Sequence, residues 1–490
     1  MRIGLAVILA LVAGLSGQHL SVAAASTDGL HVAGNRLIDD HGVPVRLLGV
    51  NRSGTEYACI RGWGIFEGPA DSASVTAMRA WYVNAVRIGL NEDCWLGING
   101  VPEQFAGAAY QHAIGDYVDA VTRAGMYAIV DLHWSAPGQA GATSLRPMAD
   151  LDHSVDFWRS VANTFADNPN VLFDAFNEPF DVGWDCWRDG CVYPGGPDTG
   201  PWHTVGMQTL VDTIRATGAT QPILLGGLHF SNDVTGWADH VPDDPRHQLV
   251  ASVHVYPFNP CAAPDCWQDD IAPLAASVPV VVGEVGPDWA PPYSDAMAND
   301  LMRWADHQDL GYLAWTWNTW GGGDALLTNH TGQTTTWGSD VRRHLTHLAV
   351  PRLDVVEQAN AAYAAGDIRR AGELYDQAAE SSSDTESQVD AATITGLARF
   401  RAVLAWTLIG DEDRASQELR SMAARDPGAA LTRLAAQFWD GYGMTGSVAS
   451  ACAQLAPDVD SQAGEVLTRL RSLGMELQHD QLCVLPSAER

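Results

Sequence analysis

Lysine is absent from this chain of 490 residues, and each of its 28 basic residues is an arginine. The absence excludes enzymes that form a Schiff base on lysine, P-loop proteins that hold phosphate with lysine, and lysine-rich nucleic-acid surfaces. Basic residues of any kind are scarce beside 59 acidic ones, and the formal net charge is −31. A field of this sign disfavours anionic polymers and anionic membrane surfaces as partners. Neutral substrates are therefore favoured.

Apolar runs that could span a membrane are lacking as well. Arg2 precedes an apolar run from Ile3 to Leu15, and Ala23–Ala25 supply small residues before Ser26. A run of about 13 residues is shorter than the roughly 20 that cross a bilayer. The pattern predicts a signal peptide over residues 1–25, with a membrane anchor as the alternative. We expect the mature protein to be soluble and secreted.

Cysteine is sparse, and its number is even. An even number of cysteines in an exported chain is typical of disulfides, although eight allow 105 connectivities. Short separations favour bridges within each of the two Cys-x4-Cys pairs, and a zinc site built from those pairs is the alternative. The eight candidates are Cys59, Cys94, Cys186, Cys191, Cys261, Cys266, Cys452 and Cys483.

Short runs rich in Val, Ile and Leu recur eight times, each followed by a loop and a helical pattern. Their starts lie about 26–52 residues apart, which is the size of one strand with its crossover helix. Because the runs are nearly continuous rather than alternating, they are typical of parallel strands buried on both faces. The expected strands are 46–50, 84–89, 127–132, 171–176, 223–226, 249–254, 280–283 and 311–316.

Eight such units predict a closed (β/α)8 TIM barrel within residues 26–350. An open doubly wound sheet is the alternative, but it usually has a glycine-rich phosphate loop after its first strand, and Gly49–Gly54 does not form one. A short hairpin over residues 30–38, turning at Gly34-Asn35, is expected to close the bottom of the barrel.

The composition changes at about Pro351, where Trp becomes scarce and Ala and Leu increase. We expect a second, all-α domain over residues 351–490. Two segments in it are similar, one beginning Gly366-Asp367 and the other Gly410-Asp411. They resemble tetratricopeptide helical hairpins, and a plain helical bundle explains the same periodicity. No catalytic motif is found there, so this domain is a candidate protein-interaction module.

Residues at the carboxyl ends of barrel strands line the active site. Polar or aromatic groups follow five of the expected strands at this end, and two of them, Glu178 and Glu284, are glutamates. A pair of carboxyl groups about 5 Å apart suits retaining glycoside hydrolysis, in which one acts as acid/base and the other attacks the anomeric carbon. Arg87 is expected to keep Glu284 ionised, and burial with a like charge to raise the pKa of Glu178.

The surrounding residues are suited to the same chemistry. Asn177 can hydrogen-bond the 2-hydroxyl of a sugar, while His254 and Tyr256 can orient the two carboxylates. Trp315 offers a flat face to a pyranose ring, and Trp317, two residues later, competes with it for this role. Each motif alone also fits a structural role: Asn-Glu-Pro can simply end a strand, and a lone histidine is often an ordinary loop residue.

Taken together, Arg87, His133, Asn177-Glu178-Pro179, His254-x-Tyr256, Glu284 and a strand-eight Trp resemble glycoside hydrolase family 5, the cellulase family. The resemblance covers roughly residues 30–345. It implies Glu178 as acid/base and Glu284 as nucleophile. It also implies supporting roles for Arg87, His133, Asn177, His254, Tyr256 and one strand-eight tryptophan, Trp315 or Trp317. Trp134, which follows His133, is a further candidate.

The resemblance implies an endo-acting, cellulase-like O-glycosyl hydrolase of neutral β-linked polysaccharide that needs no cofactor or metal. An endo-β-mannanase and an endoglycoceramidase-like glycosidase are alternatives, because the family contains these activities. A catalytically silent carbohydrate-binding barrel, with the helical domain binding protein partners, is the non-enzymatic alternative. The loop 181–203, with three tryptophans and two cysteines, is expected to form one wall of the cleft.

Overall fold

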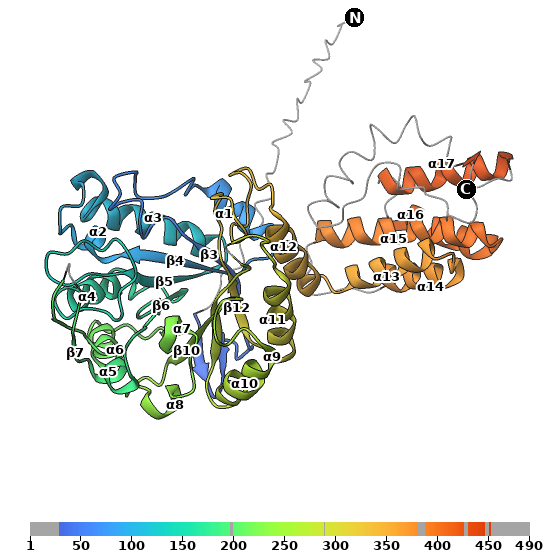
Figure 1. Ribbon diagram of the computed structural model, residues 1–490. Coiled ribbons are helices and arrows are strands. Elements are labelled where there is room, and N and C mark those ends of the chain that lie inside the picture. Colours follow the sequence, from blue (N-terminus) through green and yellow to red (C-terminus); the bar gives the residue numbers. More distant parts are fainter. Residues whose placement is uncertain are drawn as a thin grey trace, which may run out of the picture.

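The computed structural model describes residues 29–196, 199–288, 290–380, 388–425, 430–445 and 450–451. The predicted signal peptide, Cys452 and Cys483 lie outside the described residues. Figure 1 shows a barrel of strands surrounded by helices, and a separate set of helices that follows α12. Among the described residues, no helix combines the length and the apolarity that crossing a membrane requires.

Eight parallel strands close the barrel in the order β3-β4-β5-β6-β9-β10-β11-β12. Each expected strand coincides with one of them to within two residues at either end, so the predicted (β/α)8 fold is confirmed. The strands are β3 (Leu48–Arg52), β4 (Ala85–Asn91), β5 (Tyr127–Trp134), β6 (Val171–Asp174), β9 (Ile223–Gly226), β10 (Leu249–Val255), β11 (Val280–Val285) and β12 (Gly311–Ala314).

Helices connect the strands and cover the outside of the barrel (Figure 1). The longer ones are α1 (Ser72–Arg79), α3 (Ala108–Arg123), α4 (Ser154–Phe165), α6 (Met207–Ala216), α11 (Ala296–His307) and α12 (Thr336–Ala349). Shorter ones are α2 (Glu92–Leu96), η1 (Glu103–Phe105), α5 (Trp184–Asp189), α7 (Leu228–Ser231), α8 (Trp237–His240), α9 (Pro264–Cys266), η2 (Trp267–Ile271) and α10 (Ala272–Ala275). The main apolar core lies between the strands and these helices.

Alternate residues of each strand face the barrel interior, because side chains of a strand point to opposite sides in turn. In β6, Val171 and Phe173 belong to the outer core, while Leu172 belongs to a separate apolar cluster inside the barrel. Asp174 is the next interior residue of the same strand and is fully buried. The interior is therefore apolar at the amino ends of the strands and polar at their carboxyl ends.

The predicted hairpin closes the apolar end. Strand β1 (His31–Ala33) pairs antiparallel with β2 (Arg36–Ile38), and Gly34 takes the left-handed conformation that the turn needs, with φ 62°. Leu30 and Leu37 pack into the apolar cluster inside the barrel. A second small sheet, β7 (Val192–Tyr193) with β8 (Trp202–His203), lies in the long loop after β6.

The helices that the structure describes between α12 and residue 445 share their own apolar core. They are α13 (Arg352–Ala364), α14 (Ile368–Glu380), α15 (Gln388–Leu408), α16 (Glu412–Arg425) and α17 (Ala430–Thr445). Gly366 and Gly410, the glycines of the two similar segments, both have positive φ and end the helix before them. The amides of Asp367 and Asp411 then bond back to Ala362 and Trp406 at 2.9 and 2.8 Å. The sequence repeat therefore corresponds to a repeated helix–turn–helix.

Candidate active site

Arg87 lies at the centre of the polar end of the barrel. Its guanidinium donates to Glu284 at 2.8 Å, to Asp174 at 2.9 Å and to Asn177 at 2.8 Å. It also lies 3.1 Å from a carboxylate oxygen of Asp131. Arg87 is 1% exposed, so these interactions act in a medium of low polarity. One cation therefore faces several buried carboxyl groups.

The excess of buried carboxyl groups over Arg87 favours the protonated form of the acids. Burial raises the pKa of Asp131 to about 7 and that of Asp174 to about 7, although Arg87 opposes both shifts. An ionised carboxylate without solvent or a full counter-charge is unfavourable, so such a cluster holds protons at neutral pH. Neither aspartate was a candidate from the sequence. The signal was present, since both are acids within otherwise apolar strands.

Glu284 is fixed at both oxygens. Arg87 donates to Oε1 at 2.8 Å, and the hydroxyl of Tyr256 donates to Oε2 at 2.6 Å. Burial raises the pKa of Glu284, while Arg87, His133 and the Tyr256 hydroxyl oppose the rise. This carboxylate is held in one orientation, and three neighbours stabilise its charged form against the effect of burial.

Glu178 follows β6 and lies across from Glu284. A carboxylate oxygen of each, together with a ring nitrogen of His254, lie within 4.8 Å of one another. Burial raises the pKa of Glu178 well above its ordinary value, and the charge of Glu284 adds to the rise. The two glutamates thus differ in charge preference, and the distance between them is the short one that retaining hydrolysis requires.

His254 bridges the two glutamates. Its Nδ1 lies 2.9 Å from Glu178 Oε1 and 3.7 Å from Glu284 Oε1. Burial lowers the pKa of His254 well below its ordinary value, with Arg87 and His133 adding to the shift, so the ring is neutral. The ring packs against the backbone of Gly283, where a Cβ atom would lie 2.9 Å from Nε2. Glycine at this position leaves room for the histidine.

His133 and Asn177 form the next part of the site. His133 Nδ1 lies 2.6 Å from Asp131, and its Nε2 lies 3.4 Å from the amide nitrogen of Asn177. Burial lowers the pKa of His133, so its neutral ring can donate to Asp131 and accept from Asn177. Asn177 is held at its oxygen by Arg87, which aims its amide nitrogen at the cleft.

The structure separates the two competing tryptophans. Trp315 lines the cleft and stacks on His133, with 5.7 Å between ring centroids and 10° between planes. Trp317 is 5% exposed and packs edge-on against Trp81, which lies outside the barrel in the main core. Trp317 is therefore not part of the cleft. Trp134 lines the cleft and lies 6.2 Å from the ring of Tyr57.

A cavity of about 1050 Å³ opens above these residues. Several of its lining side chains were not candidates from the sequence, since they lie on loops whose course a sequence pattern does not give. Glu67 is one of them, and it accepts hydrogen bonds from Trp320 at 2.9 Å and from Tyr57. Others are Glu56, Arg61, Trp63, Leu145, His229, Phe230, Phe258, Asn259, Pro260, Pro287 and Asp324.

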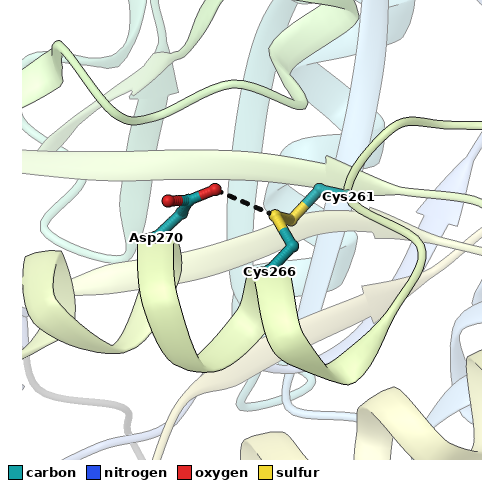
Figure 2. A group of neighbouring side chains, drawn as sticks. All are labelled: Cys261, Cys266 and Asp270. Carbon is teal, nitrogen blue, oxygen red and sulfur yellow. Dashed lines mark hydrogen bonds between the residues drawn. A yellow bond between two sulfur atoms is a disulfide. The ribbon is translucent and has the colours of Figure 1, made fainter.

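All six cysteines in the described part of the chain form disulfides: Cys59–Cys94, Cys186–Cys191 and Cys261–Cys266. Figure 2 shows the last of these beside Asp270, whose carboxylate oxygen lies 3.2 Å from the sulfur of Cys266. Sulfur atoms bonded to each other are not thiolates, so neither Cys-x4-Cys pair offers the ligands of a zinc site. The alternative of a zinc site is wrong for these four cysteines.

A family model described as cellulase, glycosyl hydrolase family 5, matches residues 38–321, which is more than half of the chain. The chain belongs to this family. Endoglucanase MaCel5A of Microbulbifer sp. (strain ALW1) is 26% identical over 328 residues, which cover 64% of this chain and 54% of that protein. A mannan endo-1,4-beta-mannosidase of Streptomyces lividans is 24% identical over 348 residues, covering 68% and 79%. The chain thus spans about half the length of the endoglucanase.

Solved structures of similar fold confirm the barrel. The beta-glucanase SdGluc5_26A from Saccharophagus degradans, solved in complex with cellotetraose, has a TM-score of 0.51 and 17% sequence identity. The superposition covers 66% of this chain and 95% of that one. At this identity the likeness concerns the fold.

Proposed function

We propose that this glycosyl hydrolase family 5 protein is a retaining β-glycoside hydrolase that cleaves a neutral β-linked polysaccharide within the chain. The observation that carries the proposal is the pair Glu178 and Glu284, with carboxylate oxygens within 4.8 Å. Inverting enzymes need a wider separation, because a water molecule has to fit between carboxylate and sugar.

In the first step, Glu178 gives its proton to the glycosidic oxygen while Glu284 attacks the anomeric carbon. The leaving saccharide departs, and a sugar ester forms on Glu284. Once Glu284 is esterified it carries no charge, so one cause of the raised pKa of Glu178 disappears. Glu178 is then stable as the carboxylate left by the first step, so it can take a proton from water, and the water oxygen displaces Glu284. No cofactor or metal takes part in this proposal.

The remaining candidate residues have supporting roles. Arg87 and Tyr256 orient Glu284, and His254 orients Glu178. Asn177 presents its amide nitrogen to the sugar 2-hydroxyl, and Trp315 supplies a stacking face for the reacting ring. His133 holds Asn177 and supports Trp315 from below.

The substrate class rests on the relatives and the charge. An endoglucanase is 26% identical to the chain and a mannan endo-1,4-beta-mannosidase is 24% identical, and two further relatives are endoglucanases. We propose β-1,4-glucan as the substrate, with β-mannan as the second candidate. A net charge of −31 favours a neutral polymer over an acidic one.

The test measures the release of reducing ends from β-glucans, mannans, xylans and glycolipids by the wild type, Glu284→Gln and Glu178→Ala. Each substitution should lower turnover by about 10³-fold or more. Azide and an activated leaving group should partly restore Glu178→Ala only, because azide replaces the base-assisted water and a good leaving group needs no acid. Near-normal turnover by Glu284→Gln would show that the nucleophile is misassigned, whereas a wild type that releases no reducing ends from any of these substrates would favour a silent binding barrel.

We propose that residues 1–25 direct export and are then removed, so that the enzyme acts outside the cell. The short N-terminal apolar run and three disulfides support this. Sequencing the N-terminus of the exported protein should give Ser26. A protein that starts at Met1 in the membrane fraction would contradict cleavage.

We propose that residues 351–490 form a tetratricopeptide-like domain that binds a protein partner. The two helix–turn–helix units α13–α14 and α15–α16, with matching glycine turns, support this assignment. Tyr82, between α1 and β4, packs against the core of these helices, so the barrel and the helices are in contact.

A further inference from the structure

One carboxylate of the cleft wall takes no part in the proposed mechanism. Glu67 is half-buried, lies between β3 and α1 and lines the cavity. Its Oε2 accepts hydrogen bonds from the Tyr57 hydroxyl, from Trp320 Nε1 at 2.9 Å and from Asn318 Nδ2 at 3.5 Å. Its Oε1 has no hydrogen-bond partner in the described part of the chain. The carboxylate is therefore fixed through one oxygen, and the other oxygen is free for a ligand.

This carboxylate is ionised and has no counter-ion. Partial burial opposes its ionisation, but the three donors and the charge of Arg52 outweigh burial and hold the pKa of Glu67 below its ordinary value. Arg52 does not pair with the carboxylate, because its guanidinium donates to backbone carbonyls, among them those of Ser53 and Glu67. Among the described residues, no arginine forms an ion pair with the Glu67 side chain. An ionised acceptor binds a charged donor more strongly than a neutral one, so the wall offers a preformed site for a cationic donor.

Aromatic rings surround the free oxygen. Trp320 is 41% exposed and Trp63 is 63% exposed, and both line the cavity. The guanidinium of Arg61 lies 5.2 Å from the ring centroid of Trp63, so this wall already holds one cation against an indole. The rings of Trp315 and Trp320 lie 6.3 Å apart between centroids. Glu67 therefore borders the sugar ring next to the one that Trp315 supports.

The carboxylate of Glu67 is on the side of the cleft away from the acid. Trp320, its hydrogen-bond donor, follows β12, and in the closed order of strands β12 lies opposite β6, which precedes Glu178. A sugar bound beside Glu67 thus stays with Glu284 when the leaving group departs. At the reacting ring itself, Asn177 donates to the group on C2. A hydroxyl or an uncharged amine can accept that bond, whereas an ammonium group cannot.

We propose that the cleft also hydrolyses a β-1,4-linked polysaccharide of 2-amino sugars, with the ammonium group of the ring beside the reacting one paired to Glu67. The inference rests on the proposed function, because the same two glutamates cleave the bond. Such a polymer keeps the linkage of β-1,4-glucan and replaces the 2-hydroxyl by an amine. The chemistry is unchanged: the proton of Glu178 goes to the leaving oxygen, the ester forms on Glu284, and water releases the sugar. The net charge of −31 attracts a cationic polymer.

The test compares two soluble substrates in one enzyme preparation: the β-1,4-linked tetramer of glucosamine, and a neutral tetramer, cellotetraose or mannotetraose. The readout is the ratio of their kcat/KM values, from which the fraction of folded enzyme cancels. The wild type should cleave both at pH 6, and the ratio of amine to neutral substrate should fall as salt is raised from about 0.01 to about 1 M, because salt screens the attraction.

Glu67→Gln keeps an oxygen for Tyr57 and Trp320 and puts an amide NH2 in place of the free oxygen. The NH2 group can bond a hydroxyl but not an ammonium group, so the ratio should fall about tenfold or more. Glu103→Gln is the matched control, since it removes the same charge from an exposed residue that does not line the cavity. It should leave the ratio at the wild-type value.

An equal loss on both substrates in Glu67→Gln would show that Glu67 binds a hydroxyl, and would overturn the amine assignment. A ratio that falls equally in Glu103→Gln would overturn it too, and so would a wild type that cleaves the N-acetylated tetramer as fast as the free amine. Cleavage of the neutral tetramer alone would overturn this inference and keep the proposed function, whereas cleavage of the amine alone would do the reverse for the neutral substrate. A wild type that cleaves no tetramer would overturn both.

Discussion

The two ends of the barrel interior have the same backbone geometry and opposite side chains. At the amino end of β6 the interior residue is Leu172, and at the carboxyl end it is Asp174, two positions later. Both are fully buried. Burial of the leucine stabilises the fold by the hydrophobic effect, whereas burial of the aspartate opposes folding unless it is paired or protonated. The apolar end therefore holds the structure together, and the polar end is maintained for chemistry.

The largest expected effect comes from removing Arg87, the cation that Asp131, Asp174 and Glu284 share. Arg87→Met should lower kcat/KM by about 10³-fold or more and destabilise the fold by about 3–5 kcal/mol, because several buried acids lose their counter-charge. Urea unfolding and activity on a soluble oligosaccharide measure the two effects. The loss of stability should be larger at pH 8 than at pH 5, where the acids are protonated.

Arg87→Lys is the control that keeps the charge and loses the fork of donors. It should recover most of the stability but little of the activity, since a lysine cannot hold Glu284, Asp174 and Asn177 together. If Arg87→Met were as stable as the wild type, the interpretation of the polar end as a cost to stability would be wrong.

A substitution at the apolar end should affect stability alone. Leu172→Ala should lower the free energy of unfolding by about 2–5 kcal/mol through lost burial and a cavity. The kcat/KM of the folded fraction should stay within about twofold of the wild type. Val192→Ala is the matched control because its side chain is 59% exposed, and it should change stability by less than about 0.5 kcal/mol. A large loss of turnover in Leu172→Ala would show that the two ends are not independent.

A smaller effect concerns the pKa of Glu178. Glu178 must be protonated to act as an acid, so activity should fall as pH rises through its pKa, which burial and Glu284 hold above the ordinary value. Glu284→Gln removes one of these causes and should lower the pKa of Glu178, as measured by direct titration of the carboxyl group. An unchanged or higher pKa would show that the two carboxylates do not interact.

The smallest expected effect concerns a second buried pair of acids, which does not line the cleft. Glu92 and Asp150 are fully buried, and burial together with Asp150 raises the pKa of Glu92 well above its ordinary value. The contribution of protonated Glu92 to stability is fully present below the ordinary pKa of glutamate. That contribution is lost as pH rises through the raised pKa. Glu92→Gln cannot ionise, so it should be more stable than the wild type at pH 8 by on the order of 1 kcal/mol.

At pH 4 that difference should vanish, which thermal unfolding at the two pH values tests. Glu103→Gln serves as the control, because Glu103 is exposed and its substitution should show no such dependence on pH. A variant Glu92→Gln that is less stable than the wild type at pH 8 would contradict the interpretation.

The fold was predictable because its signals are local. Buried parallel strands appear as continuous apolar runs, and all eight runs were identified. The positions of Glu178 and Glu284 followed, since carboxyl ends of parallel strands meet at one end of a barrel. Asp131 and Asp174 were missed as site residues because an acid within an apolar run gives no indication of its partner until the barrel closes around Arg87.

The positions of the loop side chains could not be predicted from the sequence. Phe230 comes after a strand that was correctly identified, but its exposure depends on three left-handed residues that no pattern of Leu-His-Phe-Ser predicts. The same limit applies to Glu67, whose contacts with Tyr57 and Trp320 join loops more than 250 residues apart. The alternation rule could not separate Trp315 from Trp317, because residues two apart in a strand point to the same side. The structure separates them because β12 ends at Ala314, so neither tryptophan continues the strand.

Arg87 being an arginine has one more consequence. Guanidinium keeps its proton across the whole range in which proteins stay folded, whereas an ammonium group in such a crowded interior can release its proton. The positive charge that Arg87 places beside Glu284 is therefore constant with pH. Alkaline inactivation then reports the acids of the polar end, Asp131 and Asp174 included, and can be interpreted without correcting for a changing counter-ion.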